Sequence, residues 1–97
     1  MVERILLLKL NDPSTRDEVA ALTVDALSKL PDLEELSVGV PADAASEKSW
    51  DVSIVLGVAN LALLNALLES ALFTSWHDGS LAGRCAVIKA WNFERLG

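Results

Sequence analysis

The sequence predicts one small α+β domain, residues 1–97, with elements in the order β-α-β-β-α-β. Two observations carry this prediction. Apolar stretches of the kind found in strands begin near residues 2, 33, 50 and 86. After the first and the third of them, apolar residues recur every three or four positions, as they do along one side of a helix. The alternation of these two patterns fixes the order of elements.

The first strand is expected over Val2–Leu10, and it is apolar on both faces. Side chains alternate along a strand, so its apolar residues divide into two sets. One set is Ile5 and Leu7, and the other is Leu6, Leu8 and Leu10. A strand that is apolar on both sides is covered on both sides.

The first helix follows a turn at Asn11–Ser14 and ends at Pro31. Its apolar stripe consists of Val19, Leu22, Ala26, Leu27 and Leu30. A second strand is predicted over Leu33–Val40. The next segment, Pro41–Ser49, is small and polar, so we expect a loop there.

The second half of the chain repeats the pattern. A third strand is predicted over Trp50–Val58, again apolar on both faces. Asn60 is placed to cap the start of a helix whose apolar side includes Leu64, Leu67 and Leu68. A second helical patch follows within Phe73–Arg84, and the last strand is expected over Ala86–Phe93.

This order of elements is that of the ferredoxin-like fold, in which both helices lie on one face of a four-stranded antiparallel sheet. Hydrophobic residues make up 52% of the chain, while a monomer of this size hides only about 64% of its unfolded surface. We therefore expect an apolar bare face. The residues assigned to it are Leu6, Leu8, Leu10, Val52, Ile54 and Leu56. Two such faces would pack into a symmetric homodimer and close the strands into a shared α+β barrel.

Four segments resemble the strands of the stress-responsive dimeric α/β-barrel domains. They are Val2–Leu10, Leu33–Gly39, Trp50–Val55 and Trp91–Phe93, in the order and at the spacing of that family. The resemblance implies a homodimeric barrel and, for most members, no established activity. One member, olivetolic acid cyclase, uses a His and a Tyr between sheet and helices. Those positions fall on Phe73 and Leu67 here, and neither side chain can exchange a proton, so the cyclase chemistry does not transfer.

Four side chains are candidates for a ligand site: Arg4, Trp50, Trp76 and His77. Arg4 either binds a carboxylate or phosphate between the two sheets or lies at the rim, where it reaches water or pairs with an acid such as Asp51 or Glu94. The tryptophans either line an apolar pocket or fill the core. His77 is either a displaced acid or base or an ordinary histidine near a helix end.

Composition argues against several other classes. The net charge is −6, and the 8 basic residues are scattered, so no nucleic-acid partner is expected. The lone Cys85 points to a reducing cytoplasm, and neither a metal nor a cofactor is expected, because ligand spacings and phosphate loops are lacking. The apolar stretch Ile54–Phe73 is interpreted as a strand and a helix, with no membrane span, because it contains Asn60 and Glu69.

These observations favour a homodimeric, cytoplasmic, non-catalytic barrel protein that binds a small apolar ligand between sheet and helices. The alternative is a cofactor-free enzyme, resembling a polyketide cyclase or a monooxygenase, on the same barrel. A third hypothesis is a protein-interaction domain that uses an edge strand or the acidic corner Asp32–Glu35.

Overall fold

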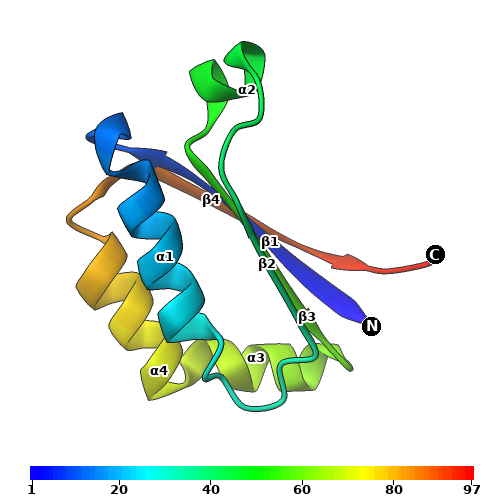
Figure 1. Ribbon diagram of the computed structural model, residues 1–97. Helices are drawn as coiled ribbons and strands as arrows, with labels where there is room; N and C mark the ends of the chain where they lie inside the picture. The colour runs from blue at the N-terminus through cyan, green and yellow to red at the C-terminus, as the bar shows by residue number, and fades with distance from the viewer.

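Four strands form one antiparallel sheet in the computed structural model, which describes all residues, 1–97 (Figure 1). The strands are β1 (Val2–Leu10), β2 (Glu35–Gly39), β3 (Val52–Val58) and β4 (Cys85–Glu94). Their spatial order is β2-β3-β1-β4, so the first and third strands lie in the middle. The predicted ferredoxin-like fold is confirmed.

One face of the sheet is covered by helices (Figure 1). They are α1 (Arg16–Leu27), α3 (Leu61–Glu69), the single turn α4 (Ala71–Thr74) and the π-helix η2 (Ser75–Leu81). A 3-10 turn, η1 (Pro13–Thr15), leads into α1. The only helix away from this layer is α2 (Ala44–Ser49), which stands off one end of the sheet.

The helical region after β3 divides at Ser70, a little before the second helical patch that the sequence predicted within Phe73–Arg84. Asn60 begins α3 as predicted, because its Oδ1 accepts a hydrogen bond from the Leu63 amide at 2.9 Å. At Ser70 the backbone turns out of the helix, with ψ of 150°. The Ser70 hydroxyl then accepts from the Phe73 amide at 3.3 Å and begins α4. This break lets α4 and η2 pack across the sheet in a different direction from α3.

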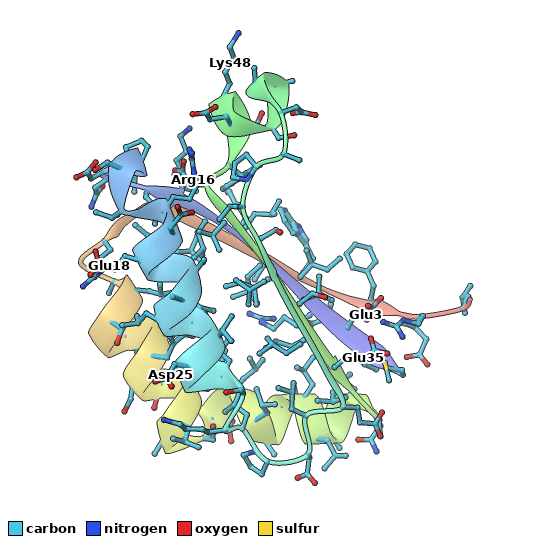
Figure 2. All side chains as sticks on the ribbon, in the orientation of Figure 1. Glu3, Arg16, Glu18, Asp25, Glu35 and Lys48 are labelled. Atoms are coloured by element: carbon cyan, nitrogen blue, oxygen red, sulfur yellow. The ribbon has the colours of Figure 1, made fainter.

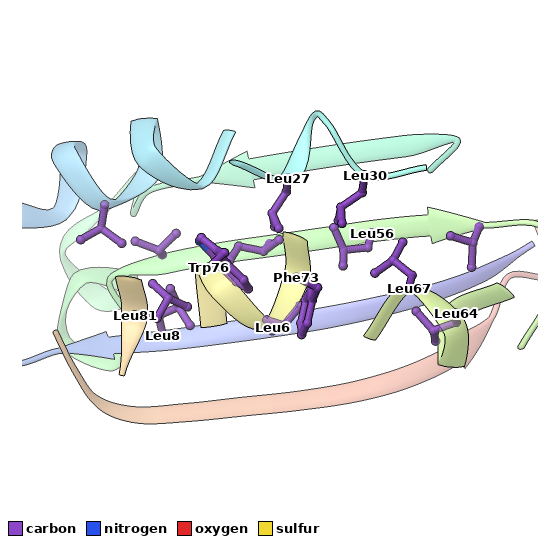
Figure 3. Close-up of a cluster of buried hydrophobic side chains, with 14 of the residues drawn as sticks. Leu6, Leu8, Leu27, Leu30, Leu56, Leu64, Leu67, Phe73, Trp76 and Leu81 are labelled. Carbon is purple, nitrogen blue, oxygen red and sulfur yellow. The ribbon is translucent and has the colours of Figure 1, made fainter. Parts of the chain in front are cut away.

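The core is a layer of apolar side chains between the sheet and the helices (Figure 3). Trp76 of η2 is its largest member and is only 2% exposed. From the sheet side, the core includes Leu6 and Leu8 of β1 and Leu56 of β3. Helix α1 contributes Leu27, on the stripe that the sequence predicted.

The six residues predicted for the dimer interface belong to this core. Leu6, Leu8, Leu10, Val52, Ile54 and Leu56 are 0–3% exposed within a single chain. Their side chains point toward the helices, so they have no surface left to bury against a partner. The prediction that they line the bare face is wrong. The alternation along each strand was correct, but the helices cover the opposite set of residues from the one expected.

The face without helices, called the open face below, is formed by the other set of side chains. Its members are Glu3, Ile5, Leu7 and Lys9 of β1, Ser53, Val55 and Gly57 of β3, Glu35, Ser37 and Gly39 of β2, and Val87, Lys89, Trp91 and Phe93 of β4. Three of its apolar residues are well exposed: Val87 at 39%, Trp91 at 46% and Phe93 at 54%. The single chain therefore leaves an apolar surface uncovered, as the composition predicted.

The segment between β2 and β3, called the arm below (residues 40–50), contains a helix where the sequence predicted a loop. Asp43 begins α2, since its Oδ1 accepts from the Ser46 amide at 2.7 Å. No residue of α2 is buried. The arm projects past the end of the sheet (Figure 1), so this helix is held by its ends and not by a packed face.

Candidate functional site

Arg4 lies on the helix-covered face of β1, between Leu56 of β3 and Asn92 of β4. Its Nη1 donates to Asn92 Oδ1 at 2.9 Å. Its Nε is enclosed and has no hydrogen-bond partner. Burial lowers the pKa of Arg4, although an arginine stays protonated at neutral pH. The expected position between two sheets and the expected partners Asp51 and Glu94 are therefore wrong, because Arg4 faces the helices.

Trp76 and His77 are neighbours in η2 with different surroundings. The Trp76 indole is in the core and donates to Thr23 Oγ1 of α1 at 3.1 Å. The His77 ring is partly exposed and stacks on Phe73, with ring centroids 5.7 Å apart. His77 Nδ1 lies 2.9 Å from Asp78 Oδ1. Trp76 thus fills the core, while His77 remains accessible beside a carboxylate of its own turn.

Trp50 lies at the end of the arm and lines a hollow of about 500 Å³. The hollow lies between the arm and one end of the open face. Leu7, Gly39 and Ser53 form its floor, and the arm supplies Val40, Pro41, Ala42, Ala45, Ser46 and Ser49. Since Arg4 faces the other side of the sheet, Trp50 and Arg4 do not belong to one site. The four predicted ligand residues are divided among three places.

Asp51 anchors the arm at the point where β3 begins. Its side chain is fully buried and accepts from the Leu10 amide at 2.8 Å and from Arg16 Nη2 at 2.6 Å. Burial alone would raise the pKa of Asp51, but these two donors outweigh it and the pKa lies below its ordinary value. Arg16 also reaches Glu47 of α2 at 3.5 Å. The start of α1 therefore contacts both Glu47 in α2 and Asp51, the residue that follows the arm.

A second charged cluster lies at the opposite end of the open face. Arg95 donates to Glu35 Oε2 at 2.5 Å and to Glu3 Oε2 at 2.6 Å. Figure 2 shows Glu3 and Glu35 close together near the chain termini. These bonds raise the pKa of Arg95, and the bond to Glu35 has the largest effect. One residue of the predicted acidic corner, Glu35, is therefore already paired.

The sequence did not point to Asn92, or to any residue of the arm other than Trp50, as a site residue. Asn92 could have been found from the pairing of the first and last strands, which places it beside Arg4.

The thiol of Cys85 has a raised pKa, because burial and the charge of Asp51 disfavour the thiolate. No group of three or more His, Cys, Asp or Glu side chains is placed to hold a metal ion. None of the helices has both the length and the apolar character needed to cross a membrane.

Comparison with known proteins supports the fold through structure alone. No protein-family model and no curated protein matches the chain. Among solved structures, a DABB-family protein with a ferredoxin-like fold from Mesorhizobium loti superposes with a TM-score of 0.83, at 8% identity over 99% of this chain and 97% of that one. A dimeric ferredoxin-like protein of unknown function from Thermobifida fusca gives 0.81 at 18% identity, over 97% and 90%. An antibiotic biosynthesis monooxygenase gives 0.75 at 13% identity, over 100% of both chains.

These likenesses define the class of fold to which the chain belongs. It is a ferredoxin-like α+β fold, shared by proteins of unknown function that include a dimeric one and by a monooxygenase. Since one fold serves several functions, activity has to be argued from this chain's own residues.

Proposed function

We propose that the chain is one subunit of a cytoplasmic homodimer of the stress-responsive dimeric α/β-barrel type, and that it binds small molecules without catalysis. The uncovered open face carries the dimer. Its apolar side chains cover β1, β3 and β4: Ile5, Leu7, Val55, Val87, Trp91 and Phe93. Contiguous exposed apolar surface of this kind marks an association site in soluble proteins.

A second copy of the chain is the partner that fits this face. An isologous contact pairs the same patch on both subunits, so an apolar sheet meets an apolar sheet. Packed sheets lie about 10 Å apart, with their side chains interdigitated. The dimeric ferredoxin-like protein from Thermobifida fusca has the same fold, which supports this choice of partner.

Sedimentation equilibrium tests the dimer directly. We expect a species of twice the 10.4 kDa chain mass at micromolar concentration, because interfaces built on whole sheet faces are of a size that gives stable complexes. A species of single-chain mass at that concentration would contradict the proposal. Addition of 0.5 M salt is expected to leave the dimer intact, because screening weakens charge contacts and not apolar ones.

The ligand site that the residues favour lies in the layer between sheet and helices, at Arg4. Only one hydrogen bond engages this guanidinium, and its enclosed Nε has no partner. A buried donor without a partner is costly, and a carboxylate can take two donors of a guanidinium at once. The apolar core residues around this layer suit a hydrophobic body. We infer a small apolar carboxylic acid as the class of ligand.

Thermal unfolding with matched probes tests this assignment. Octanoate and 2-naphthoate are compared with octanamide and 2-naphthamide. At about one hundred times the dissociation constant, a specific ligand stabilises by about 2.7 kcal/mol, so we expect the acids to raise Tm by about 10–20 °C and the amides to have little effect.

Two variants complete that experiment. Arg4→Met keeps the length of the side chain and removes its donors, and we expect it to lose the shift given by the acids. Arg84→Met is the control, since Arg84 pairs with Glu18 on the surface at 3.2 Å. Equal shifts in the wild type and in Arg4→Met would contradict a site at Arg4.

The enzyme alternative has less chemistry to draw on in this chain. In the family resemblance, the His and Tyr of the cyclase fall on Phe73 and Leu67. Both are core residues here, 6% and 3% exposed. The indole of Trp76 is occupied by Thr23. His77 and Asp78 form the remaining pair that could move a proton, and they lie together on the surface of η2.

A further inference from the structure

We propose that the two subunits are related by a two-fold axis that runs parallel to the strands, so that Trp91 of β4 packs on Ser37 of the partner subunit's β2. This inference rests on the homodimer proposed above and adds which residues meet. It comes from an uneven distribution of side-chain size across the open face.

Large and small side chains occupy opposite halves of the open face. The cross-strand register places Trp91, Ile5, Val55 and Ser37 in one row, from β4 to β2. The next row is Lys89, Leu7, Ser53 and Gly39. In both rows the bulky residues lie on β4 and β1, while the β2 edge carries only a serine or a glycine. The half of the open face at β4 and β1 is therefore raised, and the half toward β2 is low.

The low half cannot be raised by a rearrangement of its own side chains. Gly39 has no side chain, and a Cβ atom placed on it would lie 3.0 Å from Ser53 Oγ, so these two positions fit together closely. Trp91, in the raised half of the same open face, is 46% exposed. An indole ring fills most of the roughly 10 Å between packed sheets, so the surface opposite it has to be low.

Only one of the two simple dimer arrangements satisfies this requirement. An axis across the strands places β4 on the partner's β4, so that bulky residues meet bulky residues and a gap remains over Ser37 and Gly39. An axis parallel to the strands reverses the strand order and keeps each row, which places β4 on the partner's β2. Interfaces pack as densely as protein interiors, and the second arrangement fills both low halves.

The arm gives an independent reason for the same arrangement. Its hollow of about 500 Å³ lies above the low half, over Gly39 and Ser53. Nothing in the subunit fills it, and α2 has no buried residue. With the axis parallel to the strands, the partner's β4 passes beneath the arm at Lys89 and Val87. The partner would then fill the hollow and cover the inner side of α2.

Nuclear magnetic resonance on a mixed dimer tests the register without any substitution. One subunit is labelled with deuterium and 15N and the other is unlabelled, so that cross-subunit Overhauser effects are isolated. We expect effects from the Trp91 ring to the amides of Ser37 and Gly39 in the partner. Effects from the Trp91 ring to amides of Lys89 or Trp91 in the partner would overturn the proposal.

A size exchange provides a second test. Ser37→Trp overpacks the low half, and Trp91→Ser leaves a gap, so each is expected to raise the dimer dissociation constant about tenfold or more. The double variant with both changes restores one large and one small residue at each contact, and we expect a dissociation constant within about threefold of the wild type. Ser37 and Trp91 are separated by two strands within a subunit, so this rescue reports a contact between subunits.

The matched control is Ser53→Trp combined with Trp91→Ser, which changes the same residue types on the same face at a position that does not meet Trp91. We expect no rescue in this control. Rescue in both double variants, or in neither, would overturn the register. A wild-type chain that is monomeric would instead remove the homodimer itself, so the two failures are distinguishable.

Discussion

At the scale of single residues, Asp51 is the buried charge on which the arm depends. It accepts from a backbone amide of β1 and from the Arg16 guanidinium of α1, and through Arg16 it is connected to Glu47 of α2. Hydrogen bonds to a charged group are worth about 1.5–3 kcal/mol each. A carboxylate without exposure keeps its charge only because both donors are present.

We predict that Asp51→Asn lowers the free energy of unfolding by about 2 kcal/mol at pH 7. The pKa of Asp51 is lower in the folded chain than in the unfolded one, where it takes its ordinary value near 3.8. Its contribution is thus complete above that value and is lost as the pH falls below it. Urea unfolding at pH 7 and at pH 3 should show the difference between variant and wild type shrinking. A constant difference would contradict this, and Asp25→Asn, at an exposed pair with Lys29, is the control with little effect.

At the scale of elements, the helix ends are where local sequence and structure agree best. We predict that Asn60→Ala destabilises the chain by about 1 kcal/mol, because the Leu63 amide loses its cap. Asn65→Ala, on the exposed side of α3, removes the same side chain without a cap and should change stability by less than about 0.5 kcal/mol. Equal effects in urea unfolding would show that the cap contributes nothing.

The elements that the sequence did not predict are those without a buried face. The strands and α1 follow from apolar periodicity, since each places apolar side chains in the core or packed against it. In contrast, α2 has six residues, none of them buried, and its one local signal was the capping pair Asp43 and Ser46. The break at Ser70 was missed for a related reason. The apolar pattern continues through it, and only the serine hydroxyl distinguishes the start of α4.

At the scale of the whole molecule, the sequence predicted an uncovered apolar face but not which residues form it. Both sets of side chains on β1 are apolar in the middle, so hydrophobicity alone did not separate them. The decisive signal was the charge at the strand ends. Glu3 and Lys9 share a face with Ile5 and Leu7, and charged residues favour the side that helices leave open. Arg4 on the other face is the exception, and that is why it is a candidate site.

Two neighbouring positions on β1 give the sharpest test of this assignment. Leu8 is 0% exposed in the core, whereas Leu7 lies on the open face. We predict that Leu8→Asp removes most or all of the stability of the fold, because an unpaired carboxylate in the core, together with the lost leucine packing, costs more than about 4 kcal/mol and the total for a chain this small is near the low end of about 5–15 kcal/mol.

The adjacent change should have a different outcome. Leu7→Asp leaves the monomer folded, with an unchanged circular dichroism spectrum, but places two carboxylates in the interface of the dimer and raises its dissociation constant at least about a hundredfold. Circular dichroism and sedimentation on both variants separate the two effects. A dimeric Leu7→Asp chain would place the interface elsewhere, and a folded, monomeric Leu8→Asp chain would reverse the two faces. Leu7 and Leu8 are adjacent in β1, so their side chains point to opposite faces of the sheet. The face alone therefore determines whether the substitution disrupts folding or disrupts the dimer.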